Sequence, residues 1–135
     1  MKNVLRSIGA VILGFVLIAA LSTVTDAVLE SIGAIPKGKL PVYGAETTLI
    51  GILAYRALFS IAGCFLTAKL APSRPMIHAL ILGALGMTVS LLGSLAMLGA
   101  APLWFNATLV AMALPLAWLG GTLERNVDAH LTPRI

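Results

Sequence analysis

The sequence predicts an all-α integral membrane protein, a bundle of four transmembrane helices with both termini in the cytoplasm. Three observations carry this prediction: 59% of the 135 residues are hydrophobic, only 10% are charged, and four apolar stretches each exceed the length of a membrane span. Soluble domains carry roughly 25% charged residues, and a helix crosses the hydrocarbon core with about 20 apolar residues. A soluble enzyme and a disordered chain are therefore excluded, and a disulfide scaffold is excluded because Cys64 is the only cysteine.

The first helix is expected over residues 4–29. It follows the basic residues Lys2 and Arg6, as the apolar core of a signal peptide would. The uncharged run from Ser7 to Thr25 is longer than the roughly 7–15 residues of such a core. We therefore expect this segment to be retained as a transmembrane helix.

The remaining helices are expected over residues 47–70, 76–100 and 103–123, so that the whole chain, 1–135, forms one domain. Their apolar runs are continuous, without the alternation of a transmembrane β-barrel. Proline and glycine residues separate them. The connection over residues 30–46 is long, as functional loops often are, whereas the short breaks at Pro72 and Pro102 predict antiparallel neighbours.

The distribution of lysine and arginine predicts the orientation. Two, Lys37 and Lys39, fall on one side of the membrane, and six fall on the other: Lys2, Arg6, Lys69, Arg74, Arg125 and Arg134. The positive-inside rule then predicts a multi-pass membrane protein with both termini in the cytoplasm. Because topology explains the net charge of +4, no nucleic-acid partner is expected.

Two ionisable residues within the spans are the main candidates for a site. Arg56 lies inside the second helix, and Asp26 lies in the outer part of the first, so that an ion pair between them is the economical arrangement. Helical spacing places supporting polar residues on the same faces: Ser22, Glu30, Ser60 and Thr67. Three interpretations stay open: the pair only clamps two helices together, it lines a cavity or a proton or ion path, or the two residues never meet.

His78, in the first turn of the third helix, is a further candidate, either as a helix-capping group or as part of a site. His130 falls in the polar tail, so no metal site is predicted. No catalytic motif is recognisable, and neither enzymatic activity nor a cofactor is expected.

Small residues recur at four-residue spacing, as in transmembrane helices that pack closely. They are Ala10 and Gly14 in the first helix and Ala79, Gly83, Gly86, Ser90 and Ser94 in the third. The pattern fits contacts within one bundle and contacts between protomers equally well. Pro115 predicts a kink in the fourth helix.

Several clusters resemble a group of small, uncharacterised four-helix proteins of the bacterial inner membrane. The resemblance covers most of the chain, and its clusters are Thr25-Asp26, Ala54-Tyr55-Arg56, residues 68–72, residues 74–80 and residues 115–121. It implies the four-helix topology and marks Asp26, Arg56 and His78 as characteristic polar positions. It implies no activity.

Three hypotheses for function follow. The first is a structural or accessory membrane protein that acts as a homo-oligomer or as a subunit of a larger membrane complex. The second is a transporter or channel for a small solute or for protons that uses Asp26 and Arg56. The third is a lipid- or quinone-binding protein. In each case the lipid bilayer is the first partner.

Overall fold

The computed structural model describes residues 1–35, 46–96 and 101–131. These residues form four helices and no strand: α1 (Lys2–Ser31), α2 (Glu46–Leu70), α3 (Pro75–Ala96) and α4 (Leu103–Leu131). Each helix is long and apolar enough to cross a membrane. The prediction of an all-α, four-helix, multi-pass membrane protein is therefore confirmed.

The helix boundaries differ from those expected mainly in α4, which continues beyond residue 123 to Leu131. The residues after the apolar stretch are polar, but none before Pro133 breaks a helix. The apolar stretch that can span the membrane thus ends near residue 123, while the helix itself continues to Leu131. The expected end of the third helix at residue 100 and most of the 30–46 connection lie outside the described residues.

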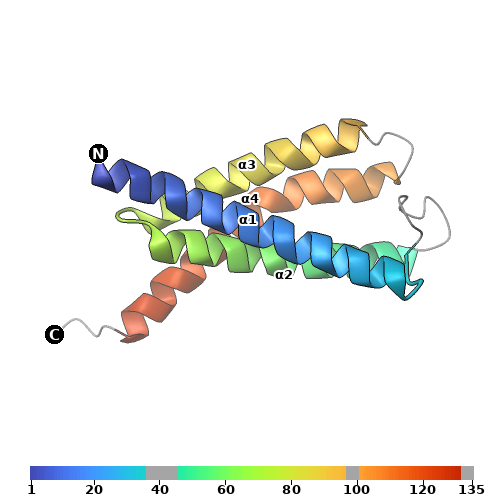
Figure 1. The fold of residues 1–135 in the computed structure, drawn as a ribbon, viewed down its shortest axis with the longest axis horizontal. Helices are drawn as coiled ribbons and strands as arrows, with labels where there is room; N and C mark the ends of the chain where they lie inside the picture. The colour runs from blue at the N-terminus through green and yellow to red at the C-terminus, as the bar shows by residue number, and fades with distance from the viewer. Residues whose placement is uncertain (36–45, 97–100, 132–135) are drawn as a thin grey trace.

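The four helices do not form a symmetric square. Both α2 and α3 contact each of the other three helices, whereas α1 and α4 do not contact each other. The start of α1 and the end of α4 lie at one end of the bundle, which we call the terminal end; the opposite end, where α1 ends and α2 begins, is the loop end (Figure 1). From the terminal end α1 and α3 diverge, and the last part of α4, whose residues 125–131 are exposed, extends away from the bundle (Figure 1).

Close packing is concentrated in the half of the bundle towards the terminal end. A methyl group at Gly14 of α1 would overlap Thr67 of α2 and lie 2.8 Å from the Gly63 carbonyl oxygen. On the other side of the bundle, a methyl group at Gly83 of α3 would overlap Ala117 of α4. The small-residue pairs Ala10/Gly14 of α1 and Ala79/Gly83 of α3 therefore form helix–helix contacts within this bundle.

Two apolar clusters of buried residues stabilise the fold. The terminal cluster joins α2, α3 and α4 and consists of Cys64, Ala68, Ala79, Leu82 and Ala117. The loop cluster joins the loop end of α2 to the start of α4 and consists of Ile35, Leu49, Ile52, Leu53, Ala101 and Phe105. Between them the helices are less tightly packed, and Asp26 and Arg56 lie at that level.

The outer faces of the bundle are apolar. At most 22% of the most apolar window of any helix is buried within the protein. Large side chains such as Ile12, Leu58, Leu92 and Trp118 are exposed on four different helices. A surface of this kind is stable against lipid chains and not against water.

Candidate functional site

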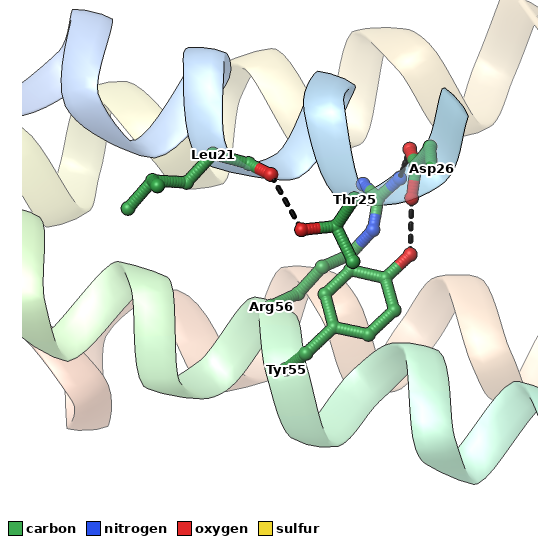
Figure 2. Close-up of polar contacts among 5 residues, drawn as sticks. All are labelled: Leu21, Thr25, Asp26, Tyr55 and Arg56. Carbon is green, nitrogen blue, oxygen red and sulfur yellow. Dashed lines mark hydrogen bonds and ion pairs between the residues drawn. The ribbon is translucent and has the colours of Figure 1, made fainter. Parts of the chain in front are cut away.

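The site is centred on an ion pair between α1 and α2. The Nη2 of Arg56 lies 2.7 Å from the Oδ2 of Asp26. The hydroxyl of Tyr55 donates a hydrogen bond to Oδ1 of the same carboxylate (Figure 2). The side chains of Arg56 and Asp26 are 34% and 29% exposed, so the pair is only partly withdrawn from its surroundings.

The helices position these groups through simple periodicity. Consecutive residues on a helix point about 100° apart, so Tyr55 and Arg56 reach the carboxylate of Asp26 from two directions. The neighbouring Thr25 does not compete for it, because its hydroxyl donates to the carbonyl oxygen of Leu21 at 2.8 Å (Figure 2). Both carboxylate oxygens are thus engaged, and the two opposite charges compensate each other.

The guanidinium of Arg56 has donor capacity to spare. It carries five N–H groups, and its Nε is buried without an acceptor in the part of the chain that the structure describes. A buried donor that lacks an acceptor is costly, most of all when it carries charge. The arrangement therefore favours an additional acceptor close to Arg56.

A cavity of about 300 Å³ lies between the two apolar clusters, and all four helices line it. Asp26 and Arg56 are part of its wall, as are the predicted supporting residues Ser22 and Ser60. The remaining wall residues are mostly apolar or small: Phe15, Ile18, Ala19, Thr23, Leu53, Ala57, Cys64, Leu82, Gly83, Gly86, Val89, Ser90, Leu109, Met112, Ala113 and Leu116.

The charged groups of the cavity wall lie towards its loop end, beside apolar residues such as Leu53 and Leu109, and no charged group among the described residues lines its terminal end. Towards the loop end, its wall contains Asp26, Arg56 and Ser90. Towards the terminal end, Phe15 and Leu82 line it, next to the terminal cluster. The helix directions set this order, because α1 and α3 run from the terminal end to the loop end while α2 runs back.

Two predicted supporting residues lie elsewhere. Thr67 is fully buried and donates a hydrogen bond to the carbonyl oxygen of Ala10 at 3.1 Å, so it ties α2 to α1 at the terminal end. Glu30 lies one helical turn beyond Asp26, near the end of α1, and does not line the cavity. Of the four supporting residues, only Ser22 and Ser60 share the cavity with the ion pair.

His78 is also separate from the ion pair. Its Nδ1 lies 3.2 Å from the carbonyl oxygen of Arg74, within the first turn of α3, and it does not line the cavity. The contact is that of a side chain hydrogen-bonding at a helix start. Among the described residues no three histidine, cysteine or acidic side chains gather as metal ligands would.

Sequence reasoning missed two parts of the site. The first is Tyr55, the second hydrogen-bond partner of Asp26. The signal that points to it is that a phenol inside a membrane span needs a hydrogen-bond acceptor, and Asp26 is expected at a similar depth. The cavity wall was missed because α4 contributes only apolar residues, such as Leu109 and Met112, which carry no polar signal.

No protein-family model, no curated protein and no solved structure matches this chain.

Proposed function

We propose that this membrane protein binds a small molecule in the cavity between its four helices, with Asp26 and Arg56 as the polar part of the site. The observation that supports the proposal is the cavity itself, which has contributions from every helix and contains the ion pair. Its volume, about 300 Å³, is at the lower end of the range for small-molecule sites, and a mostly apolar wall with few polar groups is typical of them.

The proposal is tested by filling the cavity. Gly86 lines the cavity, and a Cβ there would have no atom within 4 Å, so Gly86→Leu places a side chain in empty space. Gly93 lies two turns further along α3, is equally free of neighbours and does not line the cavity, so Gly93→Leu is the matched control. Each protein is purified in lipid nanodiscs, and retained small molecules are identified by native mass spectrometry.

We expect the wild type and Gly93→Leu to retain a small molecule that Gly86→Leu has lost. Equal retention by all three proteins, or none by any of them, contradicts the proposal. Unfolding temperatures measured on the same samples show whether Gly86→Leu is folded. Ala57→Leu, from the opposite wall in α2, provides a second obstruction.

We propose ligand binding, and not transport through the bundle, because the terminal cluster closes one end of the cavity. That cluster packs α2, α3 and α4 together beyond the terminal end of the cavity, so a transport route through Asp26 and Arg56 requires these helices to separate. Flux of protons or small solutes into liposomes, lost in Asp26→Asn and Arg56→Gln, would support a transporter instead of a binding protein.

Assembly as a homo-oligomer or within a larger membrane complex is a second proposal. It is favoured by an exposed face of α2 on which Thr47, Gly51 and Ala54 are small, and a Cβ at Gly51 would meet no atom within 4 Å. Such a face lets another helix approach closely. We expect Gly51→Leu to reduce the oligomer mass found after gentle extraction, and an unchanged mass would count against this face.

A further inference from the structure

We infer that the ligand of the cavity is an uncharged, single-chain amphiphile that enters from the lipid between α1 and α3. Its hydrogen-bonding head would lie at Arg56 and its apolar chain would point towards Phe15 and Leu82. This inference rests on the proposed function, which states only that the cavity binds a small molecule. The shape, the charge balance and the opening of the cavity each support one part of it.

The shape of the cavity fits one chain with one head. Along α1 its wall extends from Phe15 to Asp26, a rise of about 16 Å at 1.5 Å per residue. On α2 it extends from Cys64 to Leu53, also about 16 Å by the same measure. A cavity of this length with a volume of only about 300 Å³ is narrow, and a two-chain phospholipid would not fit inside it.

The charge balance favours an uncharged head. Asp26 already compensates Arg56, so a bound anion would face the carboxylate and a bound cation would face the guanidinium. Either would be an unpaired charge in a medium of low dielectric constant. A carbonyl, ester or hydroxyl oxygen instead accepts a hydrogen bond from the exposed part of the Arg56 guanidinium, and Ser22, Ser60 and Ser90 add hydroxyl groups to the same wall.

The opening of the cavity faces the lipid. Of the helix pairs in contact, α1 and α3 touch least, and Gly14 faces Leu82 at that contact. Beyond this point the two helices diverge towards the loop end (Figure 1). Thr23 of α1 and Val89 of α3 line the cavity and are also exposed, as residues at the rim of an opening are.

Photolabelling in nanodiscs tests the ligand class and its orientation together. Three probes carry the same diazirine at the end of a twelve-carbon chain and differ in the head: 1-dodecanoylglycerol, dodecyl phosphate and dodecyltrimethylammonium. We expect the glycerol probe to label the terminal end of the cavity, around Phe15, Ile18 and Leu82. Labelling there by each charged probe should be weaker by about tenfold or more, since an uncompensated charge is costly in such a site.

The variants separate labelling of the cavity from labelling of the lipid-facing surface. Gly86→Leu and Ala57→Leu should abolish labelling at Phe15 and Leu82, while Gly93→Leu should leave it unchanged. The double variant Asp26→Asn/Arg56→Met removes the head site without leaving a lone charge. It should weaken labelling by the glycerol probe about tenfold, and leave labelling by a dodecane diazirine without a head unchanged.

The outcomes distinguish this inference from the proposed function. If no probe labels the cavity wall in the folded wild type, the amphiphile class is wrong; the proposed function then fails as well only if native mass spectrometry finds no small molecule that Gly86→Leu has lost. If a charged probe labels the wall most strongly, the cavity binds ligands but the uncharged class is wrong. If the glycerol probe labels residues around Asp26 instead of Phe15, the orientation is wrong.

Discussion

Arg56 would be expensive in a membrane span on its own, because a cationic side chain at the centre of a helix costs about 2.5–3.5 kcal/mol on insertion scales. Asp26 reduces this cost as the counter-ion of Arg56. Its other carboxylate oxygen accepts a hydrogen bond from the hydroxyl of Tyr55. The carboxylate therefore holds two groups of α2 in fixed positions. This triad, not a single ion pair, is the polar unit of the molecule.

Removing one charge should be worse than removing both. We expect Asp26→Asn to lower the free energy of unfolding by about 2 kcal/mol, since it leaves Arg56 without its counter-ion; partial exposure of the pair keeps the loss below that of a fully buried pair. Asp26→Asn/Arg56→Met should cost about 1 kcal/mol or less. Reversible unfolding in mixed micelles measures the free energy of unfolding of both variants. A double variant less stable than Asp26→Asn would contradict the idea that Asp26 stabilises the protein by compensating the charge of Arg56.

The sequence predicts the two charged members of the triad because an intramembrane charge is conspicuous in an apolar stretch. It does not predict Tyr55, since the rotation of α2 relative to α1 decides whether residue 55 or another neighbour of Arg56 faces Asp26. Thr67 and Ser60 share one polar stripe in the sequence, yet Thr67 bonds to the backbone of α1 and Ser60 lines the cavity. Helix periodicity identifies a face, but only tertiary packing assigns each residue on it a partner.

At the scale of the helices, close contact depends on glycines in the half of the bundle towards the terminal end. There α1 and α2 approach so closely that Gly14 leaves no room for a methyl group beside Thr67 and Gly63. The hydroxyl of Thr67 bonds across the same contact to Ala10. This contact fixes the relative position of α1 and α2, and through it the alignment of Asp26 with Arg56 further along.

Adding one methyl group at this contact should separate the helices. We expect Gly14→Ala to destabilise the protein by about 1–3 kcal/mol, the range for overpacking a close contact. Gly9→Ala, on the same helix with no atom within 4 Å of the added Cβ, should cause no loss. Unfolding in mixed micelles compares the two, and equal stabilities would show that α1 and α2 can move apart without cost.

At the scale of the whole molecule, the number of helices follows from composition, whereas the cavity does not. Four apolar stretches determine four spans, but the cavity depends on which helices touch, and α1 lies beside α2 and α3 without reaching α4. Nothing in the apolar residues of α4, such as Leu109, distinguishes a side chain that faces a cavity from one that faces lipid. That distinction is a property of the assembled bundle.

The orientation of the bundle in the membrane is a prediction from the positive-inside rule, and the chain is well suited to test it. Cys64 is 2% exposed, so the wild type should not react with a maleimide that cannot cross membranes. Ser31 and Ser73 are exposed at opposite ends of the bundle. In intact cells we expect Ser31→Cys to be labelled and Ser73→Cys to be protected, with both labelled after permeabilisation; the reverse pattern would place both termini outside.

The position of the ion pair also has a consequence for biosynthesis. Asp26 and Arg56 belong to the first two helices, and the apolar stretches of α3 and α4, residues 76–96 and 103–123, contain no lysine, arginine or acidic residue. Insertion in order from the N-terminus would therefore let the charges neutralise each other within the first helix pair, without a contribution from α3 or α4. The later helices would then insert on hydrophobicity alone, and α4 would pack on α2 and α3 last.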